Sequence, residues 1–157
     1  MASPLIEALK KTRTEKTPFG FSAPISEADV GGLGDMSIGG AAFVPSRDPA
    51  SRPHELAHAG VQQIENMIPG GTLIEALLSR LSDRAYGSQS AYRNPLERFS
   101  YGYQEATTGV PDVGFAESGS PEAVASTPRD KLSMTLRNLL DLVGSGAEAG
   151  GRYLGRR

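Results

Sequence analysis

The sequence predicts a mainly α-helical protein: a small helical core, a loop-rich N-terminal arm and a helical C-terminal extension. Apolar residues recur at helical spacing in four segments, which begin near Pro53, Thr72, Asn94 and Thr127. The 157 residues include 19 glycines and 11 prolines, well above average usage, which predicts much irregular backbone. Only 38% of the residues are hydrophobic and none is tryptophan, so we expect a modest core.

Composition also excludes several functional classes. The net charge of −2 gives no basic field that could hold nucleic acid, so we expect no nucleic-acid partner. The absence of cysteine excludes disulfides, thiolate metal sites and a cysteine nucleophile. No apolar run approaches the roughly 18 residues of a membrane span, and the N-terminus lacks the apolar stretch of a signal peptide. We therefore expect no membrane partner and a soluble protein of the cytoplasm or of a particle such as a virion.

Residues 1–52 are expected to form a short N-terminal helix and then a Gly/Pro-rich arm. Ser3 can cap the helix, Pro4 suits its first position, and three cationic residues lie at its C-terminal end: Lys10, Lys11 and Arg13. A helix this short needs a partner to dock against. Residues 17–53 read as a long loop, with at most a small hairpin between strands at residues 36–38 and 41–44, turning at Gly39-Gly40.

Three helices are expected to form the core, residues 53–108. The first runs from Pro53 to the Pro69-Gly70-Gly71 stop, with four positions facing inward: Leu56, Val61, Ile64 and Ile68. The second begins at a capping box of Thr72 and Glu75 and ends near Gly87. Its apolar side consists of Leu73, Ile74, Leu77, Leu78 and Leu81.

The third core helix begins at Asn94, a good capping residue, has Pro95 at its first position and runs toward Gly109. Residues 109–126 read as a linker. Residues 127–143 are expected to form a C-terminal helix, capped by Thr127 and Asp130, with an apolar side of Leu132, Leu136, Leu139, Leu140 and Val143. Residues 144–157 read as a flexible basic tail that ends in Arg156 and Arg157.

Both histidines of the chain fall in one motif, His54-Glu55-Leu56-Ala57-His58. On a helix, positions four apart face the same way, so both imidazoles can reach one metal ion such as Zn²⁺. Glu55 would lie close enough to a metal-activated water to act as general base. The alternative is two surface histidines in the first turn of an ordinary helix, where Glu55 only complements the helix dipole.

The segments HELAHAGVQQ (54–63) and NPLERFSYGYQE (94–105) resemble the zincin metallopeptidases, specifically small gluzincin-like domains. The resemblance implies a peptide-bond hydrolase with a peptide or protein substrate, His54 and His58 as zinc ligands, Glu55 as catalytic base, and a glutamate of the later helix as third ligand. Glu97 is the better match and Glu105 the runner-up. Glu97 also fits a capping box with Asn94, in which its carboxylate would turn back to the helix start.

By the same resemblance, Tyr101 or Tyr103 could donate a hydrogen bond to a tetrahedral oxyanion. The alternative is that these tyrosines only cover the contact between two helices.

A second function is compatible with the same residues. The Gly/Pro-rich body and the two ends of the chain suit a non-catalytic component of a larger assembly, for example a phage virion. Such a component would bind protein partners through its N-terminal helix and basic C-terminal tail. It could carry the His54–His58 motif as a degenerate or purely structural site.

Overall fold

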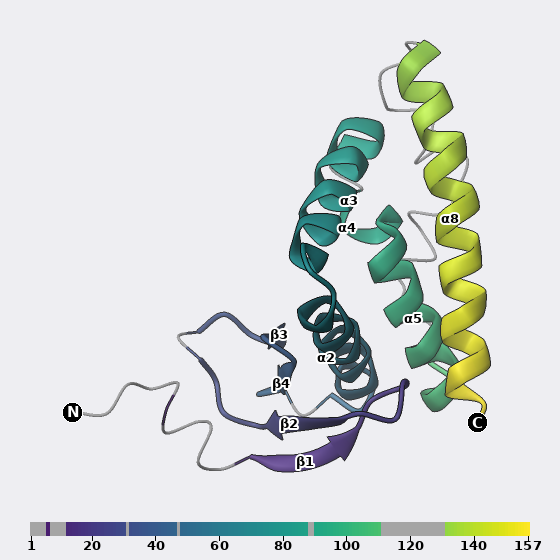
Figure 1. Ribbon diagram of the computed structural model, residues 1–157. Helices are drawn as coiled ribbons and strands as arrows, with labels where there is room; N and C mark the ends of the chain where they lie inside the picture. The colour runs from purple at the N-terminus through teal and green to yellow at the C-terminus, as the bar shows by residue number, and fades with distance from the viewer. Residues whose placement is uncertain (1–5, 7–11, 31, 47, 88–89, 111–130) are drawn as a thin grey trace.

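The computed structural model describes residues 6, 12–30, 32–46, 48–87, 90–110 and 131–157 (Figure 1). It confirms a mainly helical protein that also contains a small sheet. The strands are β1 (Arg13–Lys16), β2 (Ser22–Ser26), β3 (Met36–Ile38) and β4 (Ala41–Phe43). The helices are α2 (Ser51–Met67), α3 (Gly71–Tyr86), α4 (Ser90–Arg93), α5 (Pro95–Thr108) and α8 (Lys131–Gly155).

The arm is not a long loop: it builds a four-stranded sheet in the order β1-β2-β4-β3. β1 pairs antiparallel with β2, β2 pairs parallel with β4, and β4 pairs antiparallel with β3. Arg13, expected at the end of the N-terminal helix, instead begins β1. The rest of that predicted helix, apart from Ile6, lies outside the described residues. The predicted hairpin is confirmed: Gly39 and Gly40 both have positive φ, 60° and 87°, as a tight two-residue turn requires.

One face of the sheet packs on α2 (Figure 1). The contact is made of small and branched apolar side chains, all buried: Ala23, Ile25, Ala42, Val44, Leu56 and Ala59. Gly60 lets the β1–β2 turn come close, since a Cβ there would lie 2.9 Å from Cβ of Thr17. Tertiary packing of this kind explains why four short strands form although their sequences carry little strand signal.

The start of α3 differs from the prediction. Its N-cap is Gly70 and no side chain caps it, so Thr72 and Glu75 form no capping box. Gly71 lies so close to α2 that a Cβ would be 2.2 Å from the Glu65 carbonyl oxygen, and this close turn rotates the helix. As a result Leu73, Ile74 and Leu77 are exposed, and the helix packs instead through Leu78, Leu81, Ala85 and Tyr86 against α8.

The predicted flexible tail is wrong: α8 continues through Gly144 to Gly155 and lies side by side with α5 (Figure 1). Arg152 pairs with Glu105 at 2.7 Å and with Glu148 at 2.9 Å, and Arg98 also pairs with Glu148 at 2.8 Å. Leu139 and Val143, expected on the apolar side, are exposed.

The start of the predicted C-terminal helix and most of the linker, residues 111–130, lie outside the described residues. Within the described part of the chain, no helix is both long enough and apolar enough to cross a membrane.

Candidate metal centre

The two histidines lie inside a helix rather than at its exposed end. α2 begins at Ser51, three residues before His54, where Asp48 accepts hydrogen bonds from the Ala50 amide and the Ser51 hydroxyl. The side chains of His54 and His58 are only 12% and 15% exposed. The earlier helix start and this burial contradict the alternative of two surface histidines.

The third group comes from the beginning of α5. The Asn94 side chain accepts a hydrogen bond from the Leu96 amide at 2.9 Å, and the Asn94 amide donates to the Ser90 carbonyl at 2.9 Å. Because the N-cap amide already has this partner, Glu97 is not needed for a capping box. Its carboxylate points instead at the two imidazoles.

The three groups meet at one point. The His54 Nε2 to His58 Nε2 distance is 3.2 Å, the His58 Nε2 to Glu97 Oε2 distance is 3.2 Å, and the His54 Nε2 to Glu97 Oε2 distance is 3.4 Å. A tetrahedral ion with bonds of about 2.0–2.1 Å separates its ligand atoms by about 3.3–3.4 Å. The triangle therefore has the size that such an ion requires, and this group could hold a metal ion.

Electrostatics at the triangle favour a charged carboxylate. Burial alone would raise the pKa of Glu97, but the hydrogen bonds and charges of His54 and His58 outweigh it and lower this pKa to about 2. Burial acts to lower the pKa of His58, but the hydrogen bond and charge of Glu97 prevail and raise it. Without an ion the imidazoles and the carboxylate stabilise each other; a bound cation would take over that role.

Glu55 lies beside the triangle in a cleft of about 430 Å³. Burial raises the pKa of its carboxyl, against the opposing effect of His58 and His54. A carboxylate with a raised pKa is a stronger base, as general-base chemistry requires. The cleft is lined by residues of β3, α2, α3, α4 and α5: Met36, Ser37, His54, Glu55, His58, Gln62, Glu75, Tyr92, Glu97 and Tyr101.

Of the remaining predicted site residues, one lines the cleft and two lie at the contact between α5 and α8. Tyr101 lines the cleft, with its ring centroid 4.5 Å from that of His54. Tyr103 does not line it: its backbone contacts α8 near Gly151 and Gly155, and burial raises the pKa of its phenol. Glu105, the runner-up ligand, is bound by Arg152 on the same side of α5. Tyr103 and Glu105 lie away from the cleft because α8 packs on α5. The sequence does not predict this contact, because it predicts a flexible tail in place of the last turns of α8.

Sequence reasoning missed several residues of the cleft. Gln62 fixes β3 beside the histidines: its amide nitrogen donates to the Ser37 carbonyl at 3.2 Å, and its oxygen accepts from the Gly40 amide at 3.0 Å. The paired glutamines after the motif were a visible signal for this contact. Tyr92 and Ser37 gave none, since they come from other elements. Glu75 fits the sequence pattern of a capping box with Thr72, and this pattern gives no sign that Glu75 lines the cleft.

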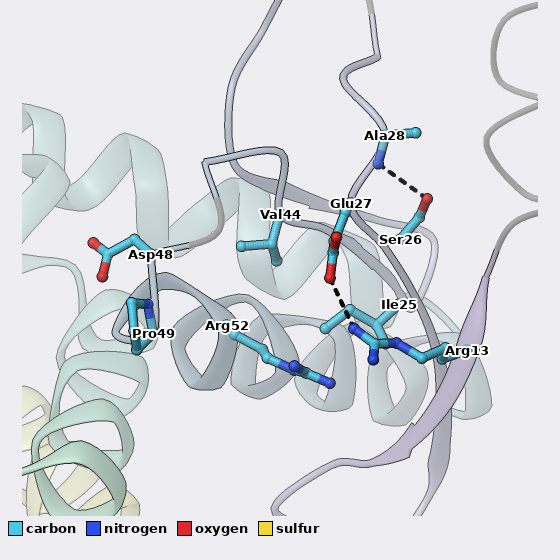
Figure 2. Close-up of a pocket in the computed structure, with 9 residues that line it drawn as sticks. All are labelled: Arg13, Ile25, Ser26, Glu27, Ala28, Val44, Asp48, Pro49 and Arg52. Carbon is cyan, nitrogen blue, oxygen red and sulfur yellow. Dashed lines mark hydrogen bonds and ion pairs between the residues drawn. The ribbon is translucent and has the colours of Figure 1, made fainter.

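A larger cavity of about 770 Å³ lies between the sheet and the N-terminal end of α2 (Figure 2). Ile25, Val44 and Pro49 contribute apolar surface to it. Both of its arginines are engaged: Arg13 bonds Glu27 at 2.9 Å, and Arg52 bonds Glu15 at 3.0 Å. Neither histidine of the chain lines it, so the group that could hold a metal ion lies at the smaller cleft.

Comparison of this chain with family models, with curated proteins and with solved structures finds no match.

Proposed function

We propose that this protein is a zinc-dependent, zincin-like hydrolase of peptide bonds. The observation that carries the proposal is the triangle of two imidazole nitrogens and one carboxylate oxygen with sides of 3.2–3.4 Å. Two neutral imidazoles and a carboxylate are a ligand set that zinc prefers, and three protein ligands leave a fourth position open, as in catalytic zinc sites.

The chain's own residues supply the rest of the chemistry. A zinc ion held there would lower the pKa of a water and polarise a substrate carbonyl. Glu55 would take the proton of the attacking water and pass it to the amine that leaves when the C–N bond breaks. Tyr101, whose ring lies against that of His54, would donate a hydrogen bond to the oxyanion.

The sheet offers a place for an extended peptide. β3 is an edge strand, and two of its residues, Met36 and Ser37, line the cleft. An edge strand can pair with a peptide backbone through those amides and carbonyls that have no partner yet; in β3 the Ser37 carbonyl is already bound by Gln62. The bonds of Gln62 to Ser37 and Gly40 keep this edge beside His58.

Metal content tests the ligand set. We expect the purified protein to contain close to one zinc per chain by elemental analysis, and His58→Ala to abolish it. Glu97→Gln should weaken zinc binding strongly, whereas Glu105→Gln, a matched change on the same helix, should leave it unchanged. Equal zinc content in the Glu97→Gln and wild-type proteins would contradict this ligand set.

Hydrolysis tests the activity. We expect the zinc-loaded protein to cleave members of a peptide library, and Glu55→Gln to abolish cleavage while it retains the metal. The alternative is a structural zinc site in a component of an assembly. It is favoured by exposed apolar residues at the end of α2, in the turn that follows and on α3, namely Met67, Ile68, Leu73, Ile74 and Leu77. Full zinc content without any cleavage would support that alternative and overturn the peptidase.

A further inference from the structure

The charge of the cleft is unbalanced. Three carboxyl groups line it, those of Glu55, Glu75 and Glu97, and none of its lining residues is lysine or arginine. A doubly charged ion would be neutralised by Glu55 and Glu97 together. Glu75 would then remain as a negative group in the cleft without a cationic partner among the lining residues.

Glu75 is held in place by a second, buried carboxyl. Glu65 lies eleven residues after His54, three helical turns along the same face of α2. Its carboxyl lies close enough to that of Glu75 for Glu75 to raise its pKa. Glu65 is only 8% exposed, and its Oε2 has no hydrogen-bond partner among the described residues.

This contact fixes the roles of the two groups. Burial and then the neighbouring Glu75 raise the pKa of Glu65 to about 7, so Glu65 keeps its proton more readily than an ordinary glutamate. Its protonated carboxyl can donate a hydrogen bond to the side chain of Glu75, which lines the cleft.

We propose that Glu75, positioned by Glu65, binds a positively charged group of the substrate and so directs cleavage to peptides that carry such a group near the scissile bond. The inference rests on the proposed peptidase function. Two sources of this chemistry exist, a lysine or arginine side chain and a free α-amino group. The group would pair with a partly buried carboxylate, where charge-assisted hydrogen bonds are stronger than in water.

Matched peptides test the inference. One series carries lysine, norleucine or glutamate at each position around a single cleavage site, and each peptide is made with a free and with an acetylated amino terminus. We expect kcat/KM to be about tenfold higher for the lysine peptide than for its norleucine match. If the acetylated peptides lose the preference, the α-amino group is the charge that Glu75 binds.

Variants assign the preference to Glu75. Glu75→Gln should bring the lysine and norleucine peptides to within about twofold of each other without loss of zinc, and Glu75→Lys should favour the glutamate peptide. Asp83→Asn removes a charge from an exposed position two turns further along α3 and should keep the wild-type preference. Glu65→Gln, which still donates a hydrogen bond to Glu75, should keep it too, whereas Glu65→Leu should reduce it.

Binding keeps the test independent of turnover. Fluorescence anisotropy of labelled peptides on the zinc-loaded Glu55→Gln protein should show tighter binding of the charged peptide, and Glu75→Gln in that background should remove the difference. Absence of cleavage together with a charge preference in binding would overturn the peptidase but keep the recognition site. Cleavage with no preference for charge, or with a preference that survives Glu75→Gln, would overturn this inference alone.

Discussion

Three glutamates in or near the cleft, Glu55, Glu65 and Glu97, differ in pKa because their neighbours differ. Burial acts to raise the pKa of all three carboxyl groups. Glu97 faces two imidazoles that reverse the effect and lower its pKa to about 2. Glu65 faces another carboxyl, which adds to the effect of burial, and its pKa rises to about 7. Burial raises the pKa of Glu55 against the opposing effect of the histidines. If the proposed function holds, one residue type would thus supply a ligand, a base and a hydrogen-bond donor.

The pKa of Glu65 predicts how stability depends on pH. In the unfolded chain this carboxyl loses its proton near its ordinary value of 4.5, whereas in the folded protein it keeps the proton to about pH 7. Between these values the folded state binds more protons, so its contribution to the free energy of unfolding is full below pH 4.5 and is lost as pH rises to about 7. Urea denaturation from pH 4 to pH 8 should show this loss, and Glu65→Gln should remove it. A wild-type minus variant difference that stays constant with pH would contradict the prediction.

The residues of the candidate site could be predicted from the sequence to the extent that they lie close together along the chain. His54, Glu55 and His58 share one helix, where spacing alone fixes the direction of each side chain. Glu97 was found by resemblance and by its place after Asn94, but only the structure separates it from Glu105. Glu75 reaches the cleft because of the close turn at Gly71, and no pattern along the chain encodes that contact.

At the scale of elements, the start of α5 links stability to the site. The side chain of Asn94 caps the helix through its oxygen, and its side-chain nitrogen Nδ2 also donates a hydrogen bond to the Ser79 hydroxyl of α3 at 3.3 Å. The cap therefore fixes both the first turn of α5 and its position against α3. Glu97 lies in that first turn, so the position of its carboxylate beside the two imidazoles depends on the cap.

Loss of the cap should therefore weaken both folding and metal binding. Asn94→Ala removes the acceptor for the Leu96 amide and should lower the free energy of unfolding by about 1 kcal/mol. It should also weaken zinc binding, because Glu97 would no longer be held at one distance from the histidines. Asn94→Ser restores a capping oxygen and should recover most of both losses. Chemical denaturation and a competitive zinc titration measure the two effects. If Asn94→Ala lowered stability but kept full zinc affinity, the cap would not be needed to position Glu97.

The helices of the core were more predictable than the strands, for a physical reason. α2, α3 and α5 carry stop signals and apolar periodicity within their own residues. β1 and β2 depend on partners elsewhere in the chain: β2 pairs with β4, and the sheet is covered by Leu56 and Ala59 of α2. A strand of three to five residues shows too few alternations to be recognised alone.

At the scale of the whole molecule, the glycines near the C-terminal end predict flexible backbone in the sequence but allow close helix packing in the structure. The glycines in residues 144–157 predict a flexible tail, yet three of them, Gly144, Gly151 and Gly155, lie where α8 approaches α5 closely. A Cβ at Gly151 would lie 2.1 Å from the Phe99 carbonyl oxygen, and one at Gly102 would lie 2.3 Å from that of Glu148. The contact buries backbone against backbone and places α8 behind the helix that carries Glu97. Helix propensity, which penalises each glycine by about 1 kcal/mol, is overridden by this packing.

Two neighbouring glycines of α8 give a matched test of this packing. Gly151→Ala puts a methyl group into the α5 backbone, so the helices must separate, and we expect a loss of about 1–3 kcal/mol in the free energy of unfolding. Gly150→Ala makes the same change where nothing lies within 4 Å of the added Cβ. Its better helix propensity should leave stability unchanged or raise it by up to about 1 kcal/mol. Urea denaturation of both variants measures the difference. If both alanines stabilised the protein equally, α8 would not pack closely on α5, and Glu105 would be free of Arg152 and available again as a metal ligand.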